Sequence, residues 1–452
     1  MNIHWKSYAK EATGLLSELL QIDTTNPPGN EQKAAKYLQG LLKKEGIKSE
    51  ILDSDVKRSN LIARLKGHKA GPKLLLLSHT DVVPVTDPKR WKYPPFSGAV
   101  KEGYVWGRGA LDMKCMTVME TLVMLLFARL DLKFSGELIY VAVADEEKGG
   151  TYGARWLVKK HKSKVKADYV INEGGGMPLS MNGKTFYTIE NVEKGLWWVR
   201  LRVKGVSGHG SVPHENNALA KASRLIDKIA NYRFPKMIAP SVREFFMKVS
   251  EALGPRGQEA AQLILVPDQE VDLKSLLSGT PVDPHLVNAF IRTTVSPTMI
   301  QAGVKENVIP DSCEFVLDFR LVPGYSREKV EETIYELASE MKDDLEIETI
   351  QYHAPSESPV NTELYKLIEE TVKEELPGVD TVPLMLTGAT DSRFWREIGT
   401  TAYGFCPLST KMSLAERAKL IHSDNERIDI ESLELGTRLL AKIAMRVLKA
   451  GT

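Results

Sequence analysis

The sequence has few cysteines and no excess of charge of either sign. Only three cysteines occur in 452 residues, at Cys115, Cys313 and Cys406, and they form no CxxC pair. This pattern argues against a disulfide framework and a thiolate zinc site, so any bound metal must be held by nitrogen and oxygen ligands. The 60 Lys and Arg residues balance 59 Asp and Glu residues. A formal net charge of +1 gives no global field that would favour nucleic acid or an anionic membrane.

Long hydrophobic runs are also missing. The N-terminal MNIHWKSYAKEATGLLSELLQID mixes acids and lysines among its leucines, so it lacks the apolar segment of a secretory signal and is typical of an amphipathic helix. The most apolar stretch, residues 118–130, contains Glu120 and is shorter than the ~20 residues that span a bilayer. Together with the low cysteine content, these features predict a cytoplasmic protein that associates with neither membrane nor nucleic acid.

The first third of the chain alternates strand-like and helix-like patterns. Short apolar stretches predict strands at residues 61–65, 74–77, 138–144 and 169–171. Helical spacing of apolar residues precedes or separates them at residues 31–45, 114–130 and 151–161. A continuous apolar run such as residues 74–77 is typical of a parallel strand buried on both faces. The alternation therefore predicts an α/β sheet flanked by helices.

From about Lys194 the pattern changes to strands with one buried face. WVRLRVKG and CEFVLDFRL alternate apolar and polar residues, which indicates an antiparallel sheet. Helical stripes at residues 219–229 and 330–341 fit between such strands, the second after an N-cap at Ser326. The length suggests two domains, and we predict a smaller α+β domain at 194–354 inserted into one formed by 1–193 and 355–452. Residues 232–285 exceed what the smaller domain needs.

Five short segments each end an apolar run with an acid or a histidine. They are LLLLSHTD with His79 and Asp81, GRGALDMK with Asp112, VAVADEE with Glu146 and Glu147, VINEGGG with Glu173, and LIHSDNE with His422. Two imidazoles and several carboxylates form the ligand mixture that borderline metals such as zinc accept. Open α/β sheets bind ligands beyond the carboxyl ends of their strands, where several of these residues are expected. The set predicts a hydrolase that uses metal ions.

Most of these residues also have an ordinary structural interpretation when each is taken alone. His79 could be a satisfied histidine in a turn, and Asp112 could be an acid at a helix N-terminus. Glu173 could be a loop acid, and His422 could cap a helix. Their joint occurrence is what favours a metal site.

The adjacent carboxylates of Glu146 and Glu147 are harder to explain structurally. At a buried strand end they would repel each other unless a cation or a proton relieved them. Neighbouring side chains point in different directions, so one could bind a metal while the other stays free as a base. Asp81, two residues after His79 in an extended segment, could accept the far ring N–H of that histidine and orient it.

A series of longer motifs carries a resemblance to a known family. In order they are SHTDVVP, GRGALDMK, ADEE, NEGG, GVSGHGSVPHENNA, ENVIP, TGATDSRF and HSDNE. They resemble the motifs of the co-catalytic dizinc metallopeptidases, which include aminoacylases, glutamate carboxypeptidase, succinyl-diaminopimelate desuccinylase and carboxypeptidase S. Similarity is greatest to the carboxypeptidase S-like branch and its N-acyl-amino-acid hydrolase relatives. It implies a catalytic domain with a mixed, largely parallel sheet and an inserted lid or dimerisation domain.

The resemblance also implies roles for individual residues. The implied metal ligands are Asp112 between two divalent ions, His79 and Glu173 on one ion, and Glu147 and His422 on the other. Zinc is the expected metal, with Mn²⁺ and Co²⁺ as alternatives. Two such ions lower the pKa of a shared water and polarise the scissile carbonyl. Glu146 would be the general base, and Asp81 would support His79.

Further roles implied by the resemblance concern the substrate and the assembly. His209, in SGHGS, would stabilise the oxyanion in the partner subunit's site, which implies a homodimer, with His214 as a weaker competitor. The implied substrate-binding residues are Asn307, Arg393, Arg320 and Gly388. The expected substrate is a small molecule, an N-acyl amino acid or a short peptide cleaved at its C-terminal residue. The alternatives are a dipeptidase and a catalytically silent binding protein of the same fold.

Overall fold

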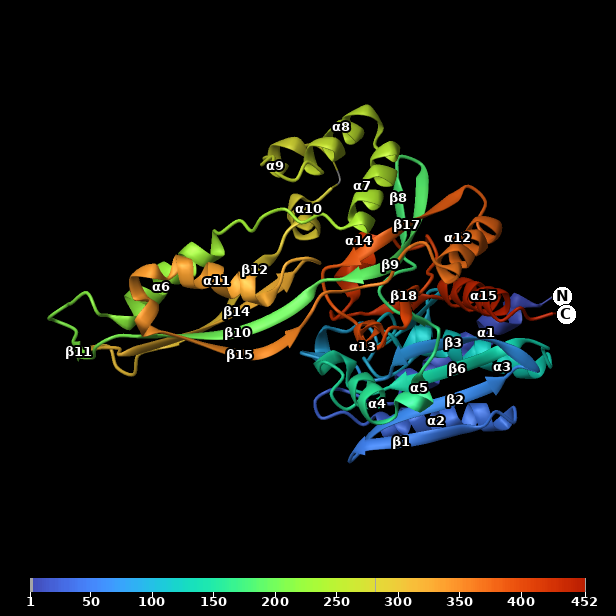
Figure 1. Ribbon diagram of the computed structural model, residues 1–452. Coiled ribbons are helices and arrows are strands. Elements are labelled where there is room, and N and C mark those ends of the chain that lie inside the picture. The colour runs from blue at the N-terminus through green and yellow to red at the C-terminus, as the bar shows by residue number, and fades with distance from the viewer. Residues whose placement is uncertain (1–2, 281, 452) are drawn as a thin grey trace. The chain divides into compact units, whose positions relative to one another are not determined.

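The computed structural model describes residues 3–280 and 282–451, and the chain divides into two compact units. The first unit contains the residues up to Asn191, then Ser358–Leu384, and those from Thr390 onward. The second contains Val192–Glu357 and Met385–Ala389. The second unit is thus inserted in the sequence of the first, and the colours of Figure 1 follow the chain out of the first unit and back.

The first unit is built on a mixed sheet with the strand order β1-β2-β6-β3-β7-β18-β9. In that order the strands are β1 (Ser49–Asp55), β2 (Arg58–Lys66), β6 (Ser135–Val143), β3 (Lys69–His79), β7 (Tyr169–Asn172), β18 (Thr401–Gly404) and β9 (Lys184–Glu193). The strands β6, β3, β7 and β18 pair in parallel, whereas β1, β2 and β9 pair antiparallel. The predicted mixed α/β sheet is confirmed, with parallel pairing confined to its centre.

Helices cover both faces of this sheet, which explains the continuous apolar run in β3. Leu74 and Leu76 belong to one core cluster, packed with residues of α1 (Trp5–Leu20), α2 (Glu31–Lys44), α3 (Lys114–Arg129), α12 (Glu363–Glu375) and α15 (Ile430–Val447). Leu75 and Leu77 belong to a second cluster, packed with residues of α4 (Ala154–Lys160) and α13 (Ser392–Glu397). Successive side chains of a strand point to opposite faces, so all four leucines are buried.

The parallel strands bring their carboxyl ends to one edge of the sheet. His79 is the last residue of β3, and Glu173 comes directly after β7. Glu146 and Glu147 follow β6 and begin the 3-10 turn Glu146–Lys148. Residues far apart in the sequence therefore meet at this edge, as predicted from the apolar runs that precede them.

Smaller elements complete the first unit. The strands β19 (Arg427–Asp429), β5 (Tyr104–Trp106) and β4 (Ala99–Lys101) form a separate small sheet, and β8 (Pro178–Met181) pairs with β9. The remaining helices are α5 (Lys162–Val165) and α14 (Leu414–Leu420). The strand β17 (Val379–Leu386) also pairs with β9. In the described part of the chain no helix combines the length and the apolarity needed to cross a membrane.

The second unit contains an antiparallel sheet with the order β12-β14-β10-β15. Its strands are β12 (Thr294–Ala302), β14 (Ser312–Leu321), β10 (Gly195–Lys204) and β15 (Leu345–His353). In β10, Val199, Leu201 and Val203 are buried while their neighbours are more exposed, as the alternation predicts. Two helices, α6 (Ala218–Ala230) and α11 (Arg327–Leu337), pack against each other, and α6 also contacts the sheet. Short strands β11 (Gly208–His209) and β13 (Val308–Ile309) pair, as do β16 (Ser356–Glu357) and the end of β9.

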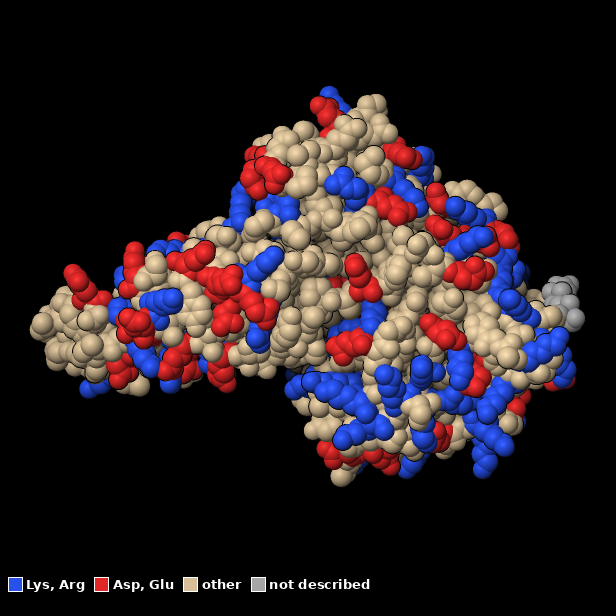
Figure 2. Space-filling view, viewed as in Figure 1, with Lys and Arg blue, Asp and Glu red and all other residues tan. Residues whose placement is uncertain are grey.

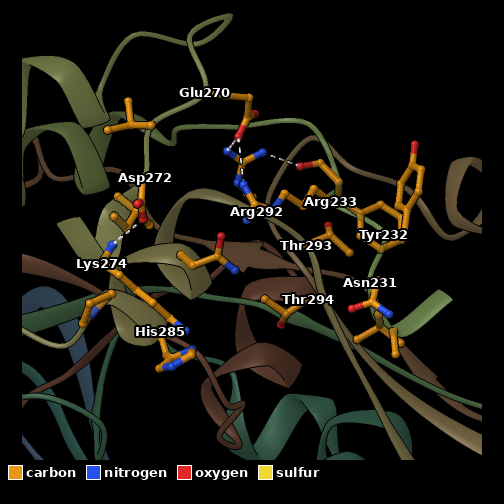
Figure 3. A pocket seen from close by; sticks show the side chains of 17 residues that line it. Asn231, Tyr232, Arg233, Glu270, Asp272, Lys274, His285, Arg292, Thr293 and Thr294 are labelled. Carbon is orange, nitrogen blue, oxygen red and sulfur yellow. Dashed lines mark hydrogen bonds and ion pairs between the residues drawn. The ribbon is translucent and has the colours of Figure 1, made fainter. Parts of the chain in front are cut away.

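Residues 232–285, which the sequence left without a role, contribute most of a helical segment of the second unit. It contains α7 (Pro240–Ala252), α8 (Gly254–Ile264), α9 (Leu273–Leu276) and α10 (Pro284–Ile291). A cavity of about 540 Å³ lies beside it. Figure 3 shows Arg292 in this cavity, where Nη2 donates to the Glu270 carboxylate at 2.8 and 2.9 Å. The lining residues that the structure describes include none of the predicted site residues.

Candidate metal centre

The five predicted ligands converge in the first unit as two groups that share Asp112. His79, Asp112 and Glu173 form one group, and Asp112, Glu147 and His422 form the other; within each group the ligand atoms lie within 4.8 Å of one another. Asp112 presents its two oxygens to different histidines: Oδ1 lies 3.1 Å from His79 Nε2, and Oδ2 lies 3.1 Å from His422 Nε2. A carboxylate held in this way can bridge two cations.

His79 is oriented by Asp81. Nδ1 of the imidazole lies 3.0 Å from the backbone oxygen of Asp81 and 3.4 Å from its Oδ1. Both contacts suit an N–H on Nδ1, which leaves Nε2 as the nitrogen that faces Asp112 and Glu173. The sequence anticipated the carboxylate as the acceptor, and in the structure the nearer acceptor is the backbone carbonyl of the same residue.

The neighbouring glutamates separate in the way that the sequence argument allowed. Glu147 Oε2 lies 3.3 Å from His422 Nε2. Its other oxygen, Oε1, is buried without a hydrogen-bond partner among the described residues. Glu146 belongs to neither ligand group. A buried carboxylate oxygen without a donor needs a cation or a proton, so the donor set fits two divalent ions of the kind that accept imidazole and carboxylate.

The pKa shifts of the ionisable residues at this edge also fit a site for cations. Burial raises the pKa of Glu146 well above its ordinary value, and the charges of Glu173 and Asp391 raise it further. Burial and the charge of Asp112 likewise raise the pKa of Glu173. Hydrogen bonds to Asp112 and Glu147 raise the pKa of His422 to about 10. The protein part of the site therefore favours bound protons, which is expected where carboxylates are gathered for cations to neutralise.

Glu426 is a supporting residue that the sequence analysis did not single out. It is fully buried, and its Oε1 accepts the backbone amides of Leu111 (2.7 Å) and Asp112 (3.1 Å). Its Oε2 accepts the Gly109 amide (3.0 Å) and Arg108 Nη1 (2.7 Å). One carboxylate thus shapes the whole loop that presents the bridging aspartate. The only sequence signal was its place at the end of HSDNE.

The segment TGATDSRF contains the predicted residue Arg393 and a second buried charged residue, Asp391. Arg393 is buried, with Nη1 donating to the Thr390 carbonyl (2.8 Å) and its guanidinium over the Phe394 ring (4.6 Å). Its neighbour Asp391 is buried with both carboxylate oxygens lacking hydrogen-bond partners among the described residues. Burial raises the pKa of Asp391 to about 7. Its Oδ1 lies so near Gly150 that a Cβ there would come within 2.8 Å.

The other predicted residues lie in the second unit. His209 is exposed, and its Nδ1 shares a hydrogen bond with the Ser211 hydroxyl (2.7 Å). The neighbouring Gly210 amide donates to the Asn307 carbonyl (2.8 Å), so His209 and Asn307 lie close together. Arg320 pairs with Asp318 on its own strand (2.8 Å). Gly388 lies in the short Met385–Ala389 segment.

Fold and donor set together define a metal-dependent hydrolase with a dinuclear type of ligand arrangement. The model of the peptidase family M20/M25/M40 matches residues 75–446, so the chain belongs to that family. This confirms the resemblance found in the sequence, and it confirms the prediction of a metal-dependent enzyme of the metallopeptidase and aminoacylase class.

Among curated proteins, the chain is similar to the N-fatty-acyl-amino acid synthase/hydrolase PM20D1 of Bos taurus, at 29% identity over 80% of this chain and 71% of that protein. It is also similar to aminoacylase-1B of Rattus norvegicus, at 25% identity over 95% of this chain and 94% of that protein.

Solved structures support the fold. The M20 family metallo-carboxypeptidase Sso-CP2 from Sulfolobus solfataricus superposes with a TM-score of 0.71 at 21% identity, covering 97% of this chain and 99% of that one. The YXEP protein of Bacillus subtilis, described as a dinuclear metal-binding peptidase of the M20 family, has a TM-score of 0.64 at 16% identity, covering 99% of this chain and 100% of that one.

Proposed function

We propose that the chain hydrolyses the amide bond of an N-acyl amino acid, or of the C-terminal residue of a short peptide, with Glu146 as general base. The main observation behind the proposal is that the two oxygens of the Asp112 carboxylate face different ligand groups: Oδ1 faces His79, and Oδ2 faces His422. Two divalent ions bound there would acidify a water molecule and polarise the scissile carbonyl. We expect zinc, with Mn²⁺ or Co²⁺ as alternatives.

Glu146 suits the role of base because it is close to the ligands without belonging to them. It adjoins Glu147 in the chain, and its backbone amide donates to Asp81 Oδ1 (3.1 Å). A half-buried carboxylate with a raised pKa can take the proton of the attacking water and hand it to the departing nitrogen. Glu147 is held by His422, so the two glutamates divide the work of binding and proton transfer.

The substrate class is supported by the names of the relatives. The protein from Bos taurus is named an N-fatty-acyl-amino acid synthase/hydrolase, and the protein from Rattus norvegicus is named an aminoacylase. Both names refer to acyl groups and amino acids, and for this chain we propose cleavage of an amide next to a free amino-acid carboxylate. We propose Asn307, Arg320, Arg393 and Gly388 as the residues that hold this substrate. An arginine fork suits the carboxylate, although Arg393 must first exchange its contact with the Thr390 carbonyl.

A homodimer with shared sites is part of the proposal. Residues 1–193 and 355–452 would form the catalytic domain, and residues 194–354 the lid or dimerisation domain. His209 is exposed, and Ser211 occupies its Nδ1, which leaves Nε2 as the nitrogen to meet a developing oxyanion. We propose that this histidine serves the site of the partner subunit. A cytoplasmic location agrees with the three cysteines, which are buried free thiols.

The first experiment joins metal content to turnover. The chelator-treated protein is titrated with Zn²⁺, Mn²⁺ and Co²⁺, and bound metal is measured beside hydrolysis of N-acyl amino acids and dipeptides. Glu146→Gln should retain the metal and lose about 10²–10⁴-fold in kcat, while Glu137→Gln, at the start of the same strand β6, should stay at the wild-type rate. Full activity of Glu146→Gln would refute the assigned base. Metal binding without turnover on any substrate would favour the silent binding protein.

The second experiment asks in which subunit His209 acts. His209→Ala and Glu146→Gln are purified separately, each with low activity, and then mixed under conditions that exchange subunits. If His209 completes the partner's site, mixed dimers regain one working site and activity rises above the sum of the two variants. No recovery, with exchange verified by mass, would place His209 in its own subunit's site or outside catalysis.

A further inference from the structure

A closed ring of hydrogen bonds lies behind the candidate metal centre. Asn26 donates through Nδ2 to Asp81 Oδ2 (2.8 Å) and to Asp145 Oδ1 (3.0 Å). Asp81 in turn accepts the backbone amides of Glu146 (3.1 Å) and Glu147 (3.3 Å), the residues that follow Asp145 in the chain. One buried amide therefore ties together two carboxylates and the turn that carries the adjacent glutamates.

Arg58 of β2 braces this ring. Its guanidinium donates to Asp145 Oδ1 (2.7 Å) and Asn26 Oδ1 (3.3 Å), and Nη2 lies 2.9 Å from Glu31 Oε1. The backbone of Gly29 packs so closely on it that a Cβ there would come within 2.6 Å of Arg58 Cζ. A planar fork with several fixed donors can serve these acceptors together, whereas a lysine ammonium acts as a point charge.

Asp145 needs this anchoring because its backbone is left-handed, with φ of 70° and ψ of 15°. Residues other than glycine adopt this conformation uncommonly, aspartate more readily than most, and the contacts of the Asp145 side chain hold it there. Asp145 Oδ2 accepts the Tyr152 amide (3.0 Å), and its carbonyl accepts the Gly150 amide (2.7 Å). The Glu146–Lys148 turn starts directly after it, so Asp145 sets the direction in which that turn leaves β6.

We propose that Asn26 and Arg58 are positioning residues for the hydrolysis, which hold the Glu146 and Glu147 carboxylates in their working directions without touching substrate or metal. The inference rests on the function proposed above. Most side-chain hydrogen bonds of the pair lead to Asp81 and to Asp145 at the start of the glutamate turn. The other side-chain contacts of Arg58 are with Asn26 itself, Glu31, the Pro28 carbonyl and the Tyr152 ring (5.1 Å). Buried ionic networks seldom stabilise a fold more than apolar packing would, which favours a positional role.

The test uses Arg58→Lys, Asn26→Leu and their double variant in the full-length protein. The matched control is Arg64→Lys, on the same strand β2, since Arg64 pairs with Glu137 and contacts none of the ligands in the described contacts. The measurements are kcat and KM at saturating metal, the affinity for each of two Zn²⁺ equivalents by competition with a chromophoric chelator, and the melting temperature of the metal-free protein.

Mutation of a residue that hydrogen-bonds to a metal ligand typically lowers metal affinity or activity by about 10–100-fold. We therefore expect each single variant to lose about 10–100-fold in kcat, with KM changed less than about twofold, and to bind one Zn²⁺ equivalent more weakly. Because the two residues act through one turn, the double variant should be little worse than the poorer single variant. Arg64→Lys should match the wild type in all these measurements.

Several outcomes would overturn the inference. The inference is wrong if the variants fold and keep the wild-type kcat and both zinc affinities. It is also wrong if the activity of each variant falls only in proportion to the fraction of protein that is folded. If Asn26→Leu does not fold, Asn26→Ser, which keeps one hydroxyl donor, takes its place with the same expectations. A wild type that binds none of Zn²⁺, Mn²⁺ and Co²⁺ would instead refute the proposed function, so the two failures are distinguishable.

Discussion

Acidic side chains have different partners in the two units. On the exposed face of the sheet in the second unit they alternate with basic ones across neighbouring strands. Arg200 lies 2.6 Å from Glu348, and Arg202 lies 2.7 Å from Glu314. Figure 2 shows acidic and basic side chains mixed over the region that contains this sheet and the helices α6 and α11. In these pairs an arginine side chain neutralises the acid, so no bound metal ion is needed to balance its charge.

At the candidate centre of the first unit the acids lack such cations. Among the described residues, the ion-pair partners of Asp112, Glu147 and Glu173 are the imidazoles of His79 and His422. Three carboxylates and two imidazoles at one partly buried edge are stable only with bound protons or metal ions. The two regions differ in what lies beside the acids: arginines in the second unit, and histidines at the candidate centre. This difference in the neighbouring basic group, rather than the number of acids, distinguishes the candidate metal centre from a charged surface.

The largest effect should come from removing the shared ligand. Asp112→Asn leaves one good acceptor where two are needed, so both ligand groups lose their common member. We expect stoichiometric metal binding to be lost and kcat/KM to fall at least about 10³-fold, because metal activation is worth several kcal/mol. Elemental analysis after reconstitution and a rate assay measure this. Two bound ions in the variant would mean that the two groups are not one centre.

A smaller effect should come from the residue that shapes the loop of Asp112. Glu426→Gln keeps the size of the side chain but replaces one acceptor oxygen by a donor, so it cannot satisfy all the N–H groups that point at it. We expect about a 10–100-fold loss of metal affinity or activity. Metal titration beside a rate assay gives the answer, and unchanged values would show that the loop keeps its shape unaided.

Glu120 is a buried acid of the first unit that lies on α3, and it should affect stability rather than catalysis. It has no well-formed hydrogen bond among the described residues, and burial raises its pKa well above the ordinary value, only partly offset by the nearby Ser78 hydroxyl and Leu77 amide. The folded state therefore keeps a proton that the unfolded state releases above about pH 4.5.

Stability contributed by this proton is fully present below the unfolded pKa and is lost as the pH rises toward the folded pKa. The free energy of unfolding should fall by up to about 1.4 kcal/mol per pH unit in that window. Glu120→Gln should remove this part of the slope. Denaturant unfolding of both proteins between pH 5 and 8 measures it, and identical slopes would mean that Glu120 is ionised in the folded protein.

The smallest effect should come from the second unit. Arg200→Ala removes the pair with Glu348, in which both side chains are substantially exposed. We expect the free energy of unfolding to change by less than about 1 kcal/mol, with kcat and metal content unchanged. A marked loss of metal from this variant would break the comparison, because it would show that these paired charges also support the centre.

Much of the fold could be predicted from local patterns. The run of leucines in β3 indicated a strand covered on both faces, and the alternation in β10 indicated a strand with one wet face; both predictions are confirmed. The N-cap of α11 in the second unit was also predicted: the Ser326 side chain accepts a hydrogen bond from the Lys329 amide. Residues 232–285 gave no prediction, because helices such as α7 and α8 are specified largely by what they pack against.

The sequence alone determined which residue types could bind metal, and the run before each of them indicated a strand end. The resemblance had already named Asp112 as the shared ligand and Glu147 rather than Glu146 as its neighbour. Only the tertiary structure decided which atoms meet: that each oxygen of Asp112 faces a different histidine, and that Glu426 accepts the backbone amides of the loop that carries Asp112. The physical reason is that strand ends are local features, whereas a donor 315 residues away along the chain is brought to its acceptor only by the folded sheet.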